Sequence, residues 1–234
     1  MSQTIVYPGQ ELELFQHATN WKSYFRSVIA PYLTGDVAEV GAGLGGTTAV
    51  LNDGSPRSWL MLEPDPSLAE LAQAKILLGE LPANASLNIG GLEAGVAEFD
   101  AILYIDVLEH IEADRQELEL AASRLRSGGH LIVLSPAFGF LFSPFDEAVG
   151  HFRRYTKSSL LTAAPSELEL VSIRYYDSLG FFASVANRLF LHKDCPTQKD
   201  VLFWDRVLVR LSRLIDPLLG HRFGKSVIAV WRKG

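Results

Sequence analysis

Cysteine is nearly absent from this sequence, since Cys195 is the only one in 234 residues. One thiol cannot form an internal disulfide, so nothing points to an oxidising compartment. Apolar runs of the roughly 18–20 residues that a membrane-spanning helix needs are missing as well. The first residues, MSQTIVYPGQELELF, have neither the basic start nor the apolar core of a signal peptide. We therefore expect a cytoplasmic protein.

Positive charge is scarce in the first part of the chain. Residues 1–150 hold 7 Lys and Arg against 20 Asp and Glu, whereas residues 151–234 hold 14 against 7, which gives net charges of −13 and +7. This uneven distribution has two interpretations. It can serve surface solubility alone, or the basic part can face an anionic substrate or a membrane surface.

Internal repeats and low-complexity linkers are also missing, and strand and helix patterns alternate instead. A helical apolar pattern over 10–30 ends before Pro31. The alternation implies a mostly parallel sheet with helices on both faces. Strands are predicted at 36–41, 58–63, 86–90, 99–106 and 130–136. Helices between them are predicted at 45–51, 66–79 and 112–126, the last ended by SGG.

The alternation stops after Pro136. Helix 157–164, strand 168–176, two helices within 181–219 and a final strand over 225–232 are predicted for the rest. We therefore expect one α/β domain over 1–234, with a helical insertion before its last strand. Its expected parts are an N-terminal helical lid (1–35), a cofactor-binding half (36–136), a substrate-side loop, strand and helical insertion (137–223) and the last strand (224–234).

The glycine-rich stretch VAEVGAGLGGTT fits two nucleotide-binding motifs. It contains G-x-G-x-x-G, typical of dinucleotide sites, and E-x-G-x-G-x-G, typical of S-adenosylmethionine sites. In both, glycines let the backbone turn tightly towards a ligand, and a helix N-terminus presents free N–H groups. The first motif uses Gly41, Gly43 and Gly46, and the second uses Glu39, Gly41, Gly43 and Gly45. The glycines alone do not say which nucleotide is bound.

Two neighbouring features favour S-adenosylmethionine. A buried Glu39 carboxylate would repel a pyrophosphate but suits an ammonium and a sulfonium; the alternative is a solvent-facing strand residue. The DVLEHI motif then places Asp106, Glu109 and His110 at the carboxyl ends of the strands, where open α/β sheets bind ligands. The order of the elements also differs from a dinucleotide fold, which normally continues with more crossovers.

With LEPDP, DVLEH and GGHLIVLSP, the chain resembles the class I S-adenosylmethionine-dependent methyltransferases, in the type 11/12-like branch with DVLEH. The resemblance covers nearly the whole chain. It implies an α/β, Rossmann-like seven-stranded sheet in the order 3-2-1-4-5-7-6, with the last strand antiparallel and helices on both faces. NWKSYFRSVIAPYL and GHFRRYT look like features of a narrower bacterial subgroup.

The resemblance also implies which residues hold the cofactor. Glu63 would bind the ribose hydroxyls, and the third strand usually ends in an Asp that reads the adenine. Gly91 stands there instead, so Leu92 or Glu93 would contact the adenine. The implied cofactor residues are Glu39, Gly41, Gly43 and Gly45 with Asp106 and Val107 near the methionine end, Glu63 at the ribose, and Pro64, Gly91 and Leu92 near the adenine.

Candidate catalytic residues are His110 and His151, because a base is needed if the acceptor keeps its proton until attack. His110 can equally be a structural histidine. The HFRRY segment around His151 can contact substrate, or it can pair with Asp146 and anchor its loop. The expected substrate residues are Phe138, Arg153, Arg154, Tyr155 and Arg188. No metal site is predicted.

Residues 201–219 read as an amphipathic helix. Its expected polar side carries Asp205, Arg206, Arg210, Arg213 and Asp216, and its expected apolar side carries Val201, Trp204, Leu208, Leu211 and Ile215. One interpretation is a lid packed on its own domain. The alternative is an apolar acceptor site, or association of 181–219 with an anionic membrane surface.

The sequence predicts methyl transfer from S-adenosylmethionine to a small-molecule or lipid-linked acceptor, at oxygen, as in the quinone and natural-product O-methyltransferases that it resembles. The alternatives are an NAD(P)-dependent oxidoreductase, although no Tyr-x-x-x-Lys pair is present, and a non-catalytic nucleotide-binding protein. Nucleic acid is not an expected partner, because an N-P-P-Y-type motif is missing and Cys195 lies in the insertion.

Overall fold

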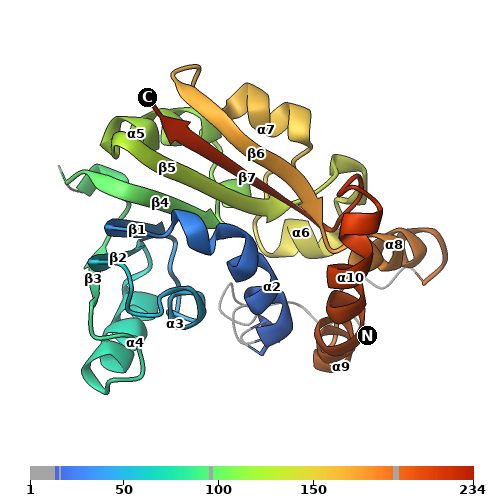
Figure 1. Cartoon of the computed structure of the whole chain (residues 1–234). Helices are drawn as coiled ribbons and strands as arrows, with labels where there is room; N and C mark the ends of the chain where they lie inside the picture. The colour runs from blue at the N-terminus through green and yellow to red at the C-terminus, as the bar shows by residue number, and fades with distance from the viewer. Residues whose placement is uncertain (1–13, 16, 95–96, 192–194) are drawn as a thin grey trace.

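A mixed sheet of seven strands forms the centre of the computed structural model, which describes residues 14–15, 17–94, 97–191 and 195–234 (Figure 1). The strands lie in the order β3-β2-β1-β4-β5-β7-β6, and β7 is antiparallel to both neighbours. The predicted sheet order and its antiparallel last strand are confirmed. The strands are β1 (Asp36–Val40), β2 (Ser58–Glu63), β3 (Ala85–Ile89), β4 (Phe99–Ile105), β5 (Leu125–Pro136), β6 (Leu168–Tyr176) and β7 (Ser226–Lys233).

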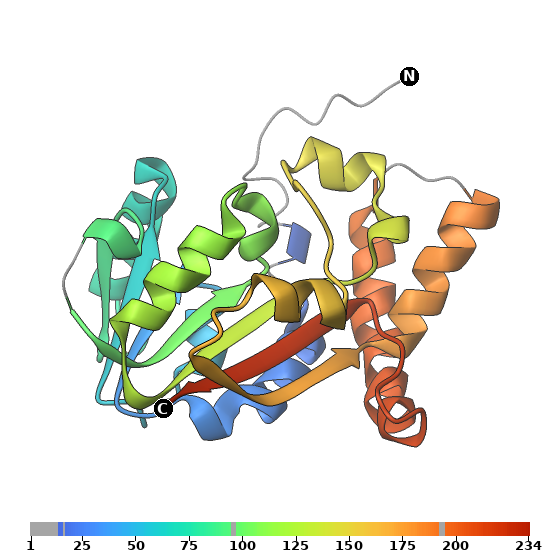
Figure 2. The same ribbon diagram turned by 90° about the horizontal axis from the view of Figure 1, so that it is seen from above.

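Helices cover both faces of this sheet (Figures 1 and 2). The helices are α2 (Thr19–Ile29), α3 (Thr48–Leu51), α4 (Pro66–Leu77), α5 (Asp114–Arg124), α6 (Pro144–Ala148), α7 (Lys157–Ala163), α8 (Ser178–Ala186), α9 (Gln198–Phe203) and α10 (Arg210–Leu218). Short 3-10 turns include Leu108–His110, and π-helical stretches lie at Asn187–Leu191 and Trp204–Val209. Of the first helix, predicted over 10–30, residues 10–13 and 16 lie outside the described residues, and α2 begins only at Thr19.

Alternation along the strands divides the core into two layers. In β1, Ala38 and Val40 pack in the layer that α5 and α7 cover, whereas Val37 packs in the layer formed with α2, α3 and α4. Successive strand side chains point to opposite faces, so a strand buried on both sides must be apolar throughout. The buried Glu39 in the middle of β1 departs from this rule.

The SGG segment does not end a helix with a loop, as the sequence predicted. Helix α5 ends at Arg124, and β5 begins at once and runs through the two glycines. The register of β5 against β4 shifts between Phe99 and Ala101 at this point. Gly128 has φ +80°, and a Cβ on Gly129 would lie 2.9 Å from a carbonyl oxygen. The glycines therefore permit an irregularity inside a strand that is longer than predicted.

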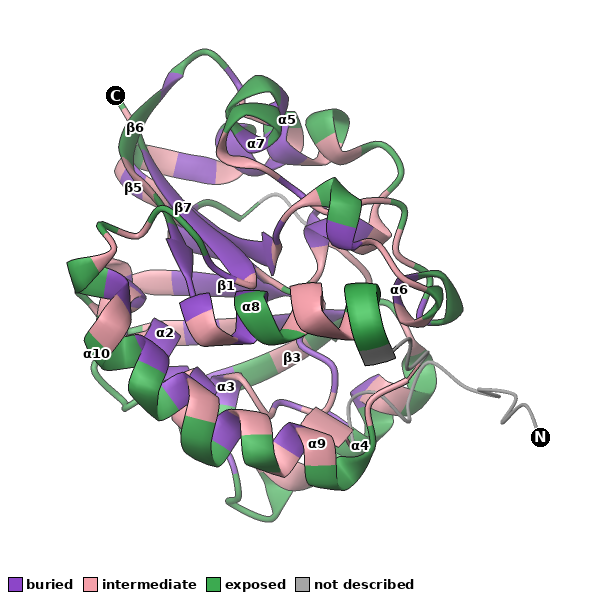
Figure 3. Cartoon of the chain, turned by 90° about the vertical axis from the view of Figure 1, so that its right-hand side faces the viewer, coloured by how far each residue is buried: buried purple, intermediate pink, exposed green. Residues whose placement is uncertain are grey.

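The predicted polar and apolar sides of 201–219 are wrong in part. Asp205 and Asp216 of the predicted polar side are buried, whereas Leu211 of the predicted apolar side is 45% exposed. Figure 3 shows buried and exposed positions alternating along α9 and α10. There are two reasons. The π-helical stretch at Trp204–Val209 shifts the helical phase, and both carboxylates accept hydrogen bonds from backbone N–H groups of distant segments. Simple helical periodicity captures neither effect.

Among the described residues, no helix is both long and apolar enough to cross a bilayer.

Candidate active site

The glycine loop after β1 has a conformation that favours glycine. Gly41, Gly43 and Gly45 have φ of +66°, +54° and +76°, in the left-handed region. A Cβ on Gly41 would lie 2.6 Å from Val107, which is too close for a side chain. The absence of a side chain on Gly41 therefore lets Val107, which follows β4, pack directly against the backbone of the loop.

Glu63, at the end of β2, fixes this loop. Its Oε2 accepts a hydrogen bond from the N–H of Gly43 at 2.7 Å, and its Oε1 accepts one from the N–H of Asp65 at 2.9 Å. Backbone N–H donors make strong hydrogen bonds to a carboxylate. The predicted ribose ligand thus also holds the cofactor loop, and its ribose role stays a prediction.

Two lysines hold the loop from its other side. Lys22 of α2 donates to the carbonyl of Gly46 at 3.2 Å, and Lys75 of α4 donates to the carbonyl of Leu44 at 3.0 Å. Burial lowers the pKa of Lys22. Neither lysine was predicted from the sequence, because their contacts join elements far apart in the chain.

Glu39 is buried behind the loop rather than in a cavity wall. Its Oε2 accepts hydrogen bonds from Thr48 Oγ1 at 2.5 Å and from Trp59 Nε1 at 2.9 Å. Burial raises the pKa of Glu39 to about 7, although these hydrogen bonds and the Lys22 charge lower it. The predicted contact of this carboxyl with the methionine end of the cofactor stays a prediction.

The remaining predicted cofactor residues lie at three places around this loop. Val107 packs against Gly41 at the start of the loop, and its contact with the methionine end of the cofactor stays a prediction. Pro64 is exposed directly after Glu63. The N–H of Gly91 bonds to Glu93 Oε1 at 3.1 Å, and Leu92 is buried in the layer that α5 covers.

One large cavity adjoins the glycine loop. Its volume is about 760 Å³. It is bounded by the loop, by the carboxyl end of β4, by the loop that follows β5, and by α8 and α9 of the insertion. Its apolar wall includes Phe25, Leu141, Phe145, Phe203, Trp204 and Leu208. Its polar wall includes Lys22, Asp106, Glu109, Asp146, His151, Arg154 and Lys225.

Asp106 and Lys225 both line this cavity, and the charge of each affects the pKa of the other. Asp106 follows β4 with φ +53°, and its side chain is reached by solvent through the cavity. Enclosure by protein raises the pKa of Asp106 to about 6, although His151, Lys225 and Lys22 lower it. Burial lowers the pKa of Lys225, whose Nζ lies 4.3 Å from the Trp204 ring centroid.

Lys225 was not predicted from the sequence either, although its position directly before β7 could have indicated it. Because β7 is antiparallel, the residue before it lies at the edge where the parallel strands end. A lysine directly before an antiparallel last strand is therefore expected at the ligand-binding edge of the sheet.

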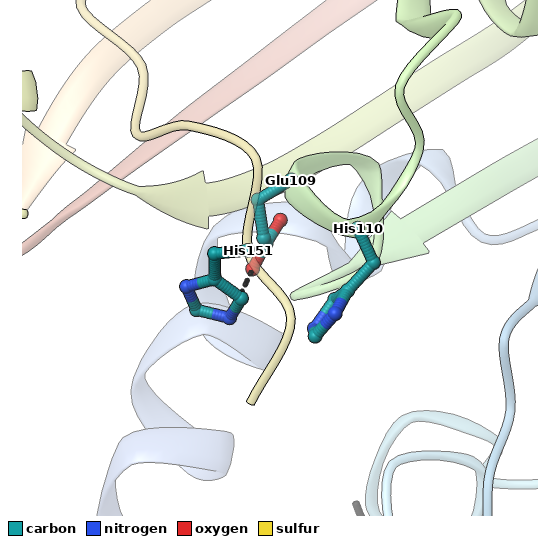
Figure 4. A group of neighbouring side chains, drawn as sticks. All are labelled: Glu109, His110 and His151. Atoms are coloured by element: carbon teal, nitrogen blue, oxygen red, sulfur yellow. Dashed lines mark ion pairs between the residues drawn. The ribbon is translucent and has the colours of Figure 1, made fainter. Parts of the chain in front are cut away.

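Glu109, His110 and His151 form one cluster (Figure 4). The first two come from the turn after β4, and His151 comes from the loop after α6. The histidine ring centroids lie 4.5 Å apart, and His151 Nε2 lies 4.0 Å from Glu109 Oε1. The N–H of Phe152 donates to the Glu109 carbonyl at 2.8 Å, which joins the two segments. Burial and the neighbouring His151 lower the pKa of His110 to about 4.

Asp146 orients His151. Its Oδ1 lies 2.9 Å from His151 Nδ1, and Arg154 donates to both carboxylate oxygens, from Nε at 2.7 Å and from Nη2 at 2.8 Å. The N–H and hydroxyl of Ser143 donate to Oδ2 as well. These partners hold the pKa of Asp146 well below its usual range. The arrangement matches the interpretation in which the HFRRY segment pairs with Asp146.

The predicted substrate side chains do not all reach the cavity. Arg154 lines it, whereas the other four are not among the described residues that do. Arg153 pairs with Asp114 at 2.6 Å, and Tyr155 donates to the same carboxylate at 2.7 Å. Phe138 stacks on Tyr175 with ring centroids 4.5 Å apart, and Arg188 donates to the Phe142 carbonyl at 2.9 Å.

The chain is similar to methyltransferases in both sequence and structure. Residues 38–133 match the family described as a methyltransferase domain. None of the curated proteins matches the chain. A methyltransferase in complex with the Haloferax volcanii Trm112 methyltransferase activator aligns with a TM-score of 0.66 and 14% identity, over 96% of this chain and 93% of that one.

Two further solved structures have the same fold. Geranyl diphosphate C-methyltransferase from Streptomyces coelicolor A3(2), in complex with Mg²⁺, geranyl diphosphate and S-adenosyl-L-homocysteine, aligns with a TM-score of 0.62 and 11% identity, over 91% of this chain and 81% of that one. The cyclase SpnF aligns with a TM-score of 0.62 and 14% identity, over 96% and 95%. At these identities the likeness shows the fold.

Proposed function

Residues 38–133 match a methyltransferase domain, and the whole chain has the fold of a methyltransferase of known structure. On that premise we propose that the chain is a class I S-adenosylmethionine-dependent methyltransferase, which methylates an oxygen of an apolar small-molecule or lipid-linked acceptor. Its cofactor is S-adenosylmethionine. When bound, this cofactor supplies a methyl group on a sulfonium, which a nucleophile displaces as the neutral thioether leaves. The protein then has to bind the cofactor and the acceptor, align them with each other and exclude water.

The enclosed carboxyl groups around the glycine loop fit a cationic cofactor. Enclosure by protein raises the pKa of Glu39 and of Asp106, because it disfavours the charged form of a carboxyl, and additional positive charge nearby would lower both values. An ammonium or a sulfonium at this end would supply that charge, whereas a pyrophosphate would add to the repulsion. This chemistry favours S-adenosylmethionine over a dinucleotide.

The observation that carries the proposal is the continuity of one cavity. The same cavity touches the glycine loop at Gly41, the polar cluster at Asp106 and His151, and the apolar insertion at Trp204. An acceptor lying against the insertion would therefore present its nucleophile between the cofactor loop and the polar cluster. Enclosed apolar walls with a few convergent polar groups are typical of small-molecule sites.

An oxygen acceptor is supported by the polar cluster. A hydroxyl has to lose its proton as its oxygen attacks the methyl carbon. His151 is the better placed of the two candidate bases, because it lines the cavity and Asp146 fixes its ring. His110 is not among the described residues that line the cavity, and a pKa near 4 makes it a poor proton acceptor.

A lipid-linked acceptor is supported by the outer surface of the insertion. Apolar side chains are exposed there close to arginines. The exposed apolar residues are Phe182, Leu189, Phe190, Phe203, Leu211, Leu214 and Leu218, and the exposed arginines are Arg206, Arg210 and Arg213. This combination suits the surface of a membrane with anionic lipids. Co-sedimentation with vesicles that contain anionic lipid tests it, and absence of binding would favour a freely dissolved acceptor.

The experiment that tests the function is an acceptor screen. Thermal shifts are measured with S-adenosylhomocysteine present, over phenols, catechols and hydroxylated lipids, because a ligand of the folded state raises the melting temperature. Compounds that shift it are then incubated with methyl-labelled S-adenosylmethionine. We expect label in a methyl ether. Label found instead in amines or at carbon would show that the oxygen proposal is wrong.

A further inference from the structure

The Glu109, His110 and His151 cluster has the composition of a metal site. Each residue offers one ligand atom, and these three atoms lie within 4.8 Å of one another. The residues come from two separate segments, and Figure 4 shows His151 facing Glu109 with His110 to one side of this pair. We propose that this cluster binds one divalent first-row transition-metal ion, such as Zn²⁺, Mn²⁺ or Fe²⁺, beside the acceptor.

The environment of His151 prepares it as a ligand. Asp146 accepts hydrogen bonds from Ser143 and Arg154, so it also acts as the acceptor for the N–H at Nδ1 of the His151 ring. The lone pair is then on Nε2, the nitrogen that lies 4.0 Å from Glu109 Oε1. A carboxylate that fixes a histidine in this way is the usual outer partner of a metal-bound imidazole. Arg154 and Ser143 hold Asp146 in place in turn.

The environment of His110 also prepares its ring as a metal ligand. A hydrogen bond to the backbone of Gly150 orients its ring and leaves one nitrogen for a ligand. Both histidine rings are therefore held by a hydrogen bond that leaves the other ring nitrogen for a ligand.

The donor set selects the kind of ion. Two imidazoles and one carboxylate suit Zn²⁺, Mn²⁺ or Fe²⁺, whereas Mg²⁺ and Ca²⁺ prefer oxygen ligands throughout. Ligands about 2.1 Å from such an ion lie roughly 3.0–3.4 Å from each other. The observed separations are wider, so the side chains would have to close by about 1 Å when the ion binds.

Three protein ligands leave coordination positions open, and those positions face the cavity. Glu109 and His151 both line the cavity, as does the neighbouring Asp106 carboxylate. This part of the inference rests on the proposed function: an oxygen of the acceptor would complete the coordination sphere. The acceptor class is thereby narrowed to molecules with a metal-binding oxygen, such as a phenol, a catechol or a carboxylate. In the metal-bound protein His151 is a ligand, so the role of base proposed for it above applies to the metal-free protein alone.

Binding of Co²⁺ tests the site directly, because its absorption bands report ligand number and type. The full chain is treated with a chelator, dialysed and titrated with Co²⁺, and Zn²⁺ is then added as a competitor. We expect saturation at one equivalent and displacement by Zn²⁺. His110→Gln and His151→Gln should each weaken binding by at least about 100-fold, and Asp146→Asn by about 10–100-fold.

The control is His130→Gln. His130 is a half-buried histidine on β5 that stacks near Tyr32, away from the cluster, and its replacement should leave the Co²⁺ affinity unchanged. Titration of every variant with S-adenosylhomocysteine checks that the fold and the cofactor site are intact. Glu109 is fully buried, so Glu109→Gln is informative only alongside that check.

The outcomes separate the two proposals. If variants that bind S-adenosylhomocysteine normally also bind Co²⁺ as the unaltered chain does, or if the unaltered chain does not saturate at one equivalent, the metal site is refuted. If Co²⁺ binds as expected but S-adenosylhomocysteine does not bind, the metal site stands and the proposed function fails.

Discussion

The Asp205 carboxylate accepts a hydrogen bond from the backbone N–H of Trp21 at 2.8 Å, across 184 positions of the sequence. It also accepts from the N–H and the side-chain amide of Asn20. Asp205 therefore caps α2, a helix whose own preceding residue, Ala18, provides no side-chain cap. This contact joins the N-terminal helix to the C-terminal insertion, and both elements line the cavity.

Replacement of Asp205 should loosen this part of the molecule. Asp205→Ala removes the cap, so we expect a loss of about 1–2 kcal/mol in the free energy of unfolding. We also expect weaker S-adenosylhomocysteine binding, since Lys22 on the same helix holds the glycine loop. Thr156→Ala is the control, because it removes the cap of α7 on the opposite face. Denaturant unfolding and calorimetry measure both effects; equal cofactor affinity in the two variants would contradict the coupling.

Glu39 should make stability depend on pH. Its pKa of about 7 in the folded chain exceeds the ordinary value of 4.5, so the folded state keeps a proton that the unfolded state loses. Stability should therefore fall as pH rises from about 4.5 to about 7, by roughly 3 kcal/mol in total from this group. Glu39→Gln keeps an oxygen to accept from Thr48 and Trp59 and should flatten this part of the profile.

The control for this profile is Glu70→Gln, at an exposed position on α4. Urea unfolding is measured at several pH values for all three proteins. An identical slope for Glu39→Gln and the unaltered chain would show that Glu39 is ionised when the protein is folded.

Glu63 should be needed for cofactor affinity. Glu63→Ala removes the acceptor of the Gly43 N–H as well as the expected ribose ligand. Loss of hydrogen bonds to a charged group costs about 1.5–3 kcal/mol, so the dissociation constant for S-adenosylhomocysteine should rise by about 10–150-fold. Glu80→Gln, on the exposed loop after α4, should bind normally. An unchanged constant in Glu63→Ala would place the ribose elsewhere.

Lys225 should act on the acceptor more than on the cofactor. Lys225→Met keeps much of the side-chain length but removes the charge that faces Asp106 in the cavity. We expect the KM for an anionic acceptor to rise by about tenfold, the effect of losing roughly 1.4 kcal/mol, with cofactor affinity little changed. Arg188→Ala removes a charge outside the cavity wall and is the control. Equal KM values for both variants would contradict a role for Lys225.

The fold was predictable because its signals are local. The strand at 58–63 and the strand at 168–176 have the bounds that the sequence predicted, since each is an apolar or alternating run between clear breaks. The glycine loop was predictable for the same reason. Helix and strand ends elsewhere shifted by a few residues, most of all at SGG, where no break separates helix from strand.

The site was less predictable because its contacts join distant segments. Asp205 and Asp216 look like solvent-facing residues of an amphipathic helix, yet each is buried and bonds to backbone N–H groups elsewhere. His151 was recognised as a candidate, but its approach to Glu109 depends on the fold of the loop after α6. Residue spacing carries no information on such pairs.

Calorimetric titration of the full chain with S-adenosylmethionine, S-adenosylhomocysteine and NAD tests the central claim most directly. We predict one-to-one binding of the first two, and no heat of binding for NAD at the same concentrations. Tight binding of NAD together with no binding of S-adenosylmethionine would contradict the assignment.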